Sequence, residues 1–163
     1  MARIALGLEY NGSAFCGWQS QTGGCAVQDA VEAALAQIAG EKVTLTAAGR
    51  TDSGVHALAQ VAHFDSRAER PASAWVRGAN ALLPSDVAIL WAHEVAGDFH
   101  ARFSAIERCY RYLLLNTAVR PALYKNQVGW FHQPLDVGVM REAAKLLLGK
   151  HDFSAFRAAE CRA

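Results

Sequence analysis

The sequence predicts an α+β fold in which a mixed or antiparallel sheet is covered by helices on one face. Strand-like and helix-like segments alternate along the chain, and the apolar residues in the clearest helical segment recur at helical spacing. Turn and stop residues separate these segments. The chain has 163 residues, of which 52% are hydrophobic and 19% charged, a composition typical of a globular protein. A globular chain of this length buries roughly 70% of its unfolded surface, so we expect a core that needs no cross-links.

The first part of the chain predicts two strands around a helix. Residues 2–10 form an apolar, β-prone run that ends at the turn sequence Asn11-Gly12-Ser13. Apolar residues at helical spacing follow, and this predicted helix should end at Gly40. Residues 43–48 are short and β-prone, and they lead into a glycine-bounded loop. The apolar positions of this predicted helix are Val27, Val31, Ala34, Leu35 and Ile38.

The middle of the chain predicts strand, helix and strand in turn. Residues 57–64 favour a strand, and residues 71–82 are compatible with a helix closed by Pro84. Residues 87–95 favour a further strand.

The last part of the chain predicts one more strand and one more helix. Residues 108–116 favour a strand, in which Arg108, Tyr110 and Tyr112 would share one face. Asp136 is a predicted N-cap for a helix through Leu148, and Gly149 is its stop signal.

The overall charge is balanced, whereas one segment is basic. Lys plus Arg is 16 and Asp plus Glu is 15, which excludes a histone-like polycation and an acidic tail. Between residues 102 and 125 the cations outnumber the acids by four, and aromatic residues are interleaved with them. This pattern favours contact with nucleic-acid phosphates over a merely solvated face. The five cations are Arg102, Arg108, Arg111, Arg120 and Lys125, and the one acid is Glu107.

The termini and the cysteines predict a cytoplasmic location. The apolar N-terminus meets Glu9 before a signal-peptide core can form, and no apolar run is long enough to span a bilayer. Cys16, Cys25, Cys109 and Cys161 form no CxxC motif and no zinc-finger spacing with histidine. We therefore expect four free thiols in a reducing compartment.

Several common catalytic motifs are missing from the sequence. It contains no GxxxxGK[ST] loop, no GxGxxG and no GxSxG. His93-Glu94 begins like an HExxH zinc motif, but Gly97 stands where the second histidine is required. We therefore expect an activity that needs no cofactor and no metal.

The loop of residues 48–57 is the best candidate for a catalytic segment. Two glycines bracket Arg50, Thr51 and Asp52, so the backbone can present the carboxylate in a tight turn. A guanidinium close to a buried carboxylate would keep it ionised. A plain β-turn with a surface ion pair fits the same residues, and the loop alone leaves both interpretations open.

The remaining motifs favour the catalytic interpretation. Residues 49–57, Gly-Arg-Thr-Asp-Ser-Gly-Val-His-Ala, closely resemble the signature loop of tRNA pseudouridine synthases of the TruA type. Four further segments resemble that family's motifs in the same order, and together they cover the chain from residue 3 to its end. They are Tyr10-Asn11-Gly12 with Gly17-Trp18-Gln19, Phe99 to Ala105, Arg108 to Tyr112, and Asp152 to Arg157. Cys109 departs from the pattern, since many members have a basic residue there.

The resemblance implies isomerisation of uridine to pseudouridine in the anticodon arm of tRNA, by a homodimer and without a cofactor or metal. It implies that Asp52 is the nucleophile, that Arg50 supports it, and that Tyr110 stacks on the substrate base. Attack on the ribose, attack on the uracil ring and elimination to a glycal all stay open for Asp52. The residues that the resemblance places against tRNA are Phe99, His100, Ala101, Arg102, Phe103, Glu160, Cys161 and Arg162.

The resemblance also implies the pseudouridine-synthase fold, whose half resembles ferredoxin-like and RRM domains. It predicts an N-terminal α+β domain over residues 1–106 that contains the catalytic loop. Residues 107–163 then begin a second, truncated α+β domain, and we expect that this chain alone can be folded yet inactive.

Three alternatives compete with this interpretation. An RRM-like RNA-binding module would need a glycine-containing motif that residues 108–115 lack. A metal-assisted hydrolase or nuclease using Asp52 would need a second acidic cluster near the loop. A non-catalytic RNA-binding or dimerisation fragment of the same fold also fits the sequence.

Overall fold

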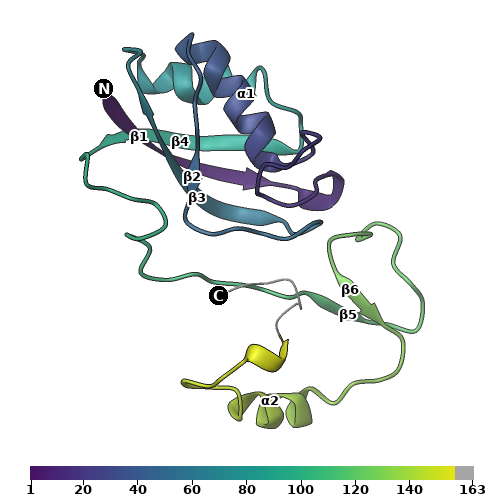
Figure 1. Ribbon diagram of the computed structural model, residues 1–163. Helices are drawn as coiled ribbons and strands as arrows, with labels where there is room; N and C mark the ends of the chain where they lie inside the picture. The colour runs from purple at the N-terminus through teal and green to yellow at the C-terminus, as the bar shows by residue number, and fades with distance from the viewer. Residues whose placement is uncertain (157–163) are drawn as a thin grey trace. The chain divides into compact units, whose positions relative to one another are not determined.

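The computed structural model describes residues 1–156. The chain forms two compact units, Met1–Arg111 and Tyr112–Ala163, each of which is described by itself (Figure 1). The predicted domain boundary after residue 106 stays a prediction. No helix in the described part of the chain is long and apolar enough to cross a membrane.

The first unit contains an antiparallel four-stranded sheet. Its strands are β1 (Ala2–Tyr10), β2 (Thr46–Ala47), β3 (Ala57–Ser66) and β4 (Val87–Val95), in the order β2-β3-β1-β4. In the register of the central strand, Leu6 lies opposite Ala62 of β3 and Ala92 of β4. The bounds of β1 and β4 coincide with the prediction, whereas β2 is shorter and β3 longer. The α+β prediction is confirmed, with an antiparallel sheet.

Two helical segments cover one face of this sheet. The helix α1 (Val27–Ala39) lies across the sheet and ends at Gly40, whose φ of 70° requires the left-handed conformation that glycine favours (Figure 1). The segment η2 (Ala74–Gly78) is a π-helical turn with α-helical residues on either side, within the predicted helix. One apolar cluster joins sheet, α1 and η2, and its largest fully buried members include Trp18, Trp75, Phe64, Leu6 and Leu35.

The turn after β1 is confirmed. The segment η1 (Gly12–Ala14) begins there, and the Asn11 side chain accepts a hydrogen bond from the amide of Ser13 at 3.1 Å. This Asx-type bond is the physical reason why Asn11 ends the strand.

The second unit is smaller. Its strands β5 (Leu114–Asn116) and β6 (Gly129–Phe131) pair in parallel, and the helix α2 (Val137–Lys145) and the turn η3 (Ser154–Phe156) follow them. Asp136 caps α2 as predicted, since its carboxylate accepts hydrogen bonds from the amides of Gly138 and Val139. The helix ends at Lys145, before the predicted Leu148.

The predicted strand over residues 108–116 is wrong for most of its length. Only Leu114–Asn116 pairs with another strand, and residues 108–113 form no ladder with any described segment. A β-strand is stabilised by its neighbour, so β-prone residues without a partner strand do not stay in a ladder. The shared strand face expected for Arg108, Tyr110 and Tyr112 is therefore absent.

The expectation of four free thiols is also wrong. Cys16 and Cys25 form a disulfide, whereas Cys109 is free and exposed, and Cys161 lies outside the described residues. The amide of Cys16 donates to the carbonyl of Cys25 at 3.0 Å, and this closure of the β1–α1 loop brings the two side chains together. Motif spacing did not indicate the pairing, because backbone contacts within the loop determine it.

Candidate functional site: a cleft beside the Asp52 loop

A cleft of about 760 Å³ opens on the first unit. Four segments line it: the loop after β1, the first turn of α1 through Gln28, the stretch around β2, and the stretch that follows β4. The residues that concern the predicted site are Trp18, Gln19, Gly49, Arg50, Arg102, Phe103, Arg108 and Tyr110. The structure therefore brings Arg50 and Tyr110 to one cleft, although they are distant in the sequence.

The loop that contains Asp52 is anchored from behind on its N-terminal side. The side-chain amide of Gln60, on β3, donates to the carbonyl of Gly49 at 2.8 Å. The amide of Trp18 donates to the carbonyl of Thr51 at 2.9 Å, and the Thr51 hydroxyl lies 2.8 Å from the Tyr10 hydroxyl. Burial raises the pKa of Tyr10, so its phenol keeps its proton for this contact.

The same loop is anchored on its C-terminal side. The Ser53 hydroxyl donates to the carbonyl of Phe15 at 3.2 Å, and Nδ1 of His56 accepts from the amide of Gly12 at 3.2 Å. His56 thus helps to fix the position of the loop against the segment after β1. Gly17 has a φ of 102°, and a Cβ there would lie 2.8 Å from the Thr51 carbonyl, so only glycine allows this approach. Hydrogen bonds therefore anchor the loop on both sides of Asp52, through Thr51 before it and Ser53 after it.

The carboxylate itself is exposed, and the expected buried pair with Arg50 is not formed. Both residues are exposed, and within residues 1–156 no hydrogen bond or ion pair joins their side chains. The amide of Val55 donates to the Asp52 carbonyl at 3.2 Å, which closes a β-turn. Arg50 lines the cleft, whereas Asp52 follows it in the turn and is not among the residues that line the cleft.

Tyr110 and Gly49 meet within the cleft. A Cβ on Gly49 would lie 3.9 Å from the Tyr110 hydroxyl, so the aromatic ring approaches the start of the Asp52 loop. The Tyr110 side chain is 71% exposed, which leaves its ring open to a planar partner.

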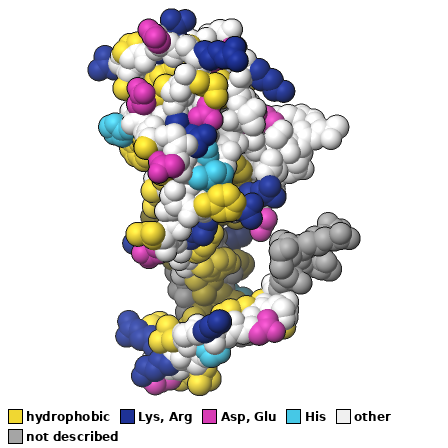
Figure 2. All heavy atoms as spheres, turned by 60° about the vertical axis from the view of Figure 1, so that its left-hand side comes forward, with side chains coloured by type: hydrophobic (Ala, Val, Ile, Leu, Met, Phe, Trp, Pro, Cys, Tyr) yellow, Lys and Arg dark blue, Asp and Glu magenta, His cyan; other side chains and the backbone are white. Residues whose placement is uncertain are grey.

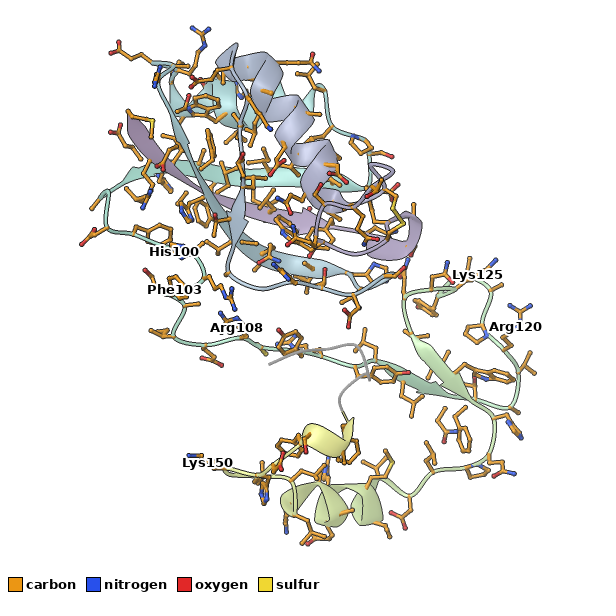
Figure 3. All side chains as sticks on the ribbon, in the orientation of Figure 1. His100, Phe103, Arg108, Arg120, Lys125 and Lys150 are labelled. Carbon is orange, nitrogen blue, oxygen red and sulfur yellow. A yellow bond between two sulfur atoms is a disulfide. The ribbon has the colours of Figure 1, made fainter. Side chains whose placement is uncertain are left out.

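The segment predicted to contact RNA forms a compact turn after β4 (Figure 3). The amides of Phe103 and Ser104 both donate to the carbonyl of His100, at 3.0 and 2.7 Å. The His100 and Phe103 rings stack with their centroids 4.3 Å apart, and the Arg102 guanidinium lies 5.8 Å from the Phe103 centroid. Phe103 is 77% exposed, so this turn presents an aromatic and a cationic side chain to solvent.

Two contacts, one buried and one partly buried, hold this turn on the sheet. Ala101 is buried, and its amide donates to Nδ1 of His63 at 3.2 Å. Burial, with the positive charge of Arg3 as a further cause, lowers the pKa of His63, which favours the neutral ring that can accept this bond. His63 is thus a hydrogen-bonded residue of the sheet that supports the turn. Arg3 also donates to the carbonyl of Phe99 at 2.9 Å.

Cations extend beyond the cleft. On the face shown in Figure 2, Lys and Arg side chains are interspersed with His and hydrophobic ones. In the second unit, Arg120, Tyr124, Lys125 and Trp130 line a separate pocket of about 150 Å³ (Figure 3). The Trp130 indole donates to the carbonyl of Thr117 at 2.9 Å, which fixes the ring at the pocket wall.

The sequence did not predict Gln60 as part of the site, and some residues that it did predict lie outside the described part of the chain. The motifs did not indicate Gln60, although a buried amide on an apolar strand is a signal for a polar anchor. Glu160, Cys161 and Arg162 lie outside the described residues. Within residues 1–156, no group of three or more His, Cys, Asp or Glu residues could hold a metal ion.

The family pattern described as tRNA pseudouridine synthase matches residues 7–104, which include the anchored loop and most of the turn after β4. The chain belongs to the tRNA pseudouridine synthase family. It is 64% identical over 163 residues to the tRNA pseudouridine synthase A of Thiobacillus denitrificans, covering 100% of this chain and 63% of that protein. It is 62% identical over 161 residues to the protein of the same name from Dechloromonas aromatica, covering 99% of this chain and 62% of that protein.

The chain and these relatives differ in length. The chain spans about 63% of the length of the first of these tRNA pseudouridine synthases. The family match covers most of the first unit, including the Asp52 loop, whereas Arg108 and Tyr110 of the cleft follow the matched residues.

Proposed function

We propose that the complete protein isomerises uridine to pseudouridine in the anticodon arm of tRNA, with Asp52 as the nucleophile. The observation that supports this most is the loop itself. Hydrogen bonds fix Gly49 and Thr51 from behind, Asp52 stays exposed, and Arg50, two residues before it, lines a cleft together with Tyr110. A nucleophile needs this combination of a rigid backbone and an accessible reactive group.

The proposed reaction moves one bond and one proton. The bond between N1 of uracil and C1′ of ribose breaks, the base turns over, and C5 bonds to C1′. The proton on C5 leaves, and N1 takes up a proton, so the product is an isomer of the substrate. In this proposal Asp52 provides the carboxylate that assists cleavage, and the Arg50 guanidinium at the cleft supplies positive charge close to it.

The target base must leave the RNA stack before it can react. Flipping a base out of a stack costs a few kcal/mol, and stacking on an aromatic ring recovers about 1–3 kcal/mol. Tyr110 has the exposed ring that this role requires, at the wall of the cleft. The exposed ring of Phe103, with Arg102 above it, suits a second contact with RNA.

The basic segment supports tRNA as the partner. Between Glu107 and Asp136 the sequence contains no acidic residue, whereas Arg108, Arg111, Arg120 and Lys125 all fall there. Lys and Arg beside exposed aromatic rings are typical of nucleic-acid surfaces. A homodimer and a cytoplasmic location belong to the same proposal.

The experiment compares this 163-residue chain with a version extended to the length of its relatives. Each is incubated with an unmodified tRNA transcript carrying tritium at C5 of uridine, and release of tritium is followed. We expect release by the extended protein. Binding of tRNA without release of tritium by the extended protein would favour the non-catalytic RNA-binding alternative.

A further inference from the structure

Arg108 connects two segments of the site through its guanidinium. Its Nε and Nη2 atoms donate to the carbonyl of Ala48 at 3.0 and 2.7 Å. Nη2 also donates to the carbonyl of Arg102 at 3.1 Å. Ala48 precedes the loop that contains Asp52, and Arg102 lies in the turn after β4, so one side chain joins the two walls of the cleft (Figure 3).

Ala48, whose carbonyl accepts from Arg108, is also hydrogen-bonded through its backbone amide. The amide of Ala48 donates to the carbonyl of Val61, on β3, at 2.7 Å, and the next carbonyl, that of Gly49, accepts from Gln60. The hydrogen bond from Arg108 thus completes a set of contacts that defines where the loop leaves the sheet. A rotation of this peptide would move every residue that follows it, including Asp52.

The shape of the guanidinium matches this contact. Its planar fork presents Nε and Nη2 to one oxygen together, which a lysine ammonium cannot reproduce. A Cβ on Gly49 would lie 3.4 Å from Nε, in ordinary van der Waals contact, so the guanidinium lies directly beside the Gly49 backbone. The structure records no ion pair for Arg108 among residues 1–156, and its described partners are neutral carbonyls.

We propose that Arg108 is a positioning residue, which fixes the spacing between the Asp52 loop and the Arg102–Phe103 turn across the cleft. This inference rests on the proposed function and assigns Arg108 a task other than phosphate contact. The basic segment would otherwise suggest phosphate contact for all of its cations.

The test uses the extended protein with Arg108→Ala and Arg108→Lys, and Arg70→Ala as the control. Arg70 also donates to a backbone carbonyl, that of Ile38 at 3.1 Å, and it does not line the cleft. Single-turnover rates and tRNA affinities over a series of salt concentrations are measured. We expect both Arg108 variants to lose about 100-fold in rate, because small misplacements of reacting groups have effects of this size. The dependence of affinity on salt should stay that of the wild type in both.

A phosphate contact would give the opposite pattern. Arg108→Lys would keep near wild-type rate and affinity, and Arg108→Ala would reduce the salt slope by about 0.7 to 0.9. That outcome would overturn the proposal.

Hydrogen exchange separates this inference from the proposed function. In Arg108→Ala the amides of residues 48–56 and 99–104 should exchange faster than in the wild type, whether or not the protein modifies RNA. Unchanged exchange in both segments would contradict the positioning role. An inactive wild type with faster exchange in the variant would leave the positioning role standing and refute only the proposed function.

Discussion

The two units differ in how their residues are packed. In the first unit a cluster of buried apolar residues joins the sheet to α1 and η2, whereas in residues 112–156 no residue is buried. The helix α2 of the second unit has Val139 at 66% exposure and no buried residue. The comparison shows that the first unit provides its own support for the Asp52 loop. The second unit contributes exposed aromatic and cationic side chains, and no described core of its own.

A tryptophan substitution in each unit tests this contrast and should show the largest effect. Trp75→Ala removes a side chain that is 2% exposed, and we expect the free energy of unfolding to fall by about 3–5 kcal/mol. Trp130→Ala removes one that is 40% exposed with one hydrogen bond, so a loss of about 1 kcal/mol is expected. Urea unfolding followed by circular dichroism measures both. Equal losses would contradict the contrast between the units.

Gln60→Ala tests whether the core unit holds the catalytic loop. The substitution leaves the Gly49 carbonyl without its buried donor, which should cost about 1–3 kcal/mol of stability. In the extended protein we also expect a lower rate of pseudouridine formation at unchanged tRNA affinity. The matched control is Gln21→Ala, whose amide donates to the Cys16 carbonyl and which does not line the cleft. A Gln60 variant with a wild-type rate would show that the loop does not need this anchor.

The second unit's contribution is tested by salt. Arg120→Ala combined with Lys125→Ala should reduce the salt slope of tRNA binding by about 0.7 to 0.9 for each phosphate that is no longer neutralised. Lys145→Ala is the control, because that ammonium lies 2.8 Å from the Glu142 carboxylate. A salt slope equal to that of the control would show that the pocket of the second unit does not contact the phosphates of tRNA.

The contact between His63 and the turn after β4 should depend weakly on pH. The pKa of His63 is lowered in the folded protein, so its contribution to stability is present above the ordinary value of about 6.5. It is lost as the pH falls through the lowered pKa, because a protonated Nδ1 cannot accept from the Ala101 amide. His63→Asn offers an oxygen acceptor that does not titrate. Its free energy of unfolding should therefore fall less than that of the wild type between about pH 7.5 and 5.5, and an equal fall would contradict the assignment.

Local sequence signals predicted most elements of the first unit. Asn11 and Gly40 marked the ends of β1 and α1, because an Asx turn and a left-handed residue act within a few residues of chain. Features that depend on contacts between distant residues were harder to predict from the sequence. The absence of a strand over residues 108–113 depends on a missing partner strand, and the Cys16–Cys25 pair depends on how the loop folds.

In the candidate site, too, local motifs could be predicted and features that depend on long-range contacts could not. The motif loop placed Asp52 and Arg50, and the resemblance added Tyr110, which the structure brings to the same cleft as Arg50. Neither the exposure of Asp52 nor the anchoring by Gln60 could be predicted, since both depend on which segments fold behind the loop.

The most direct test of the central claim replaces the carboxylate in the extended protein. Asp52→Asn keeps the size of the exposed side chain and removes its charge, so the fold and tRNA binding should be unchanged. We predict that tritium release from C5-labelled tRNA becomes undetectable in this variant under single-turnover conditions, while tRNA affinity stays within about twofold of the wild type, because the anchoring of the loop does not use the carboxylate. Wild-type release by Asp52→Asn would contradict the assignment of Asp52 as the nucleophile.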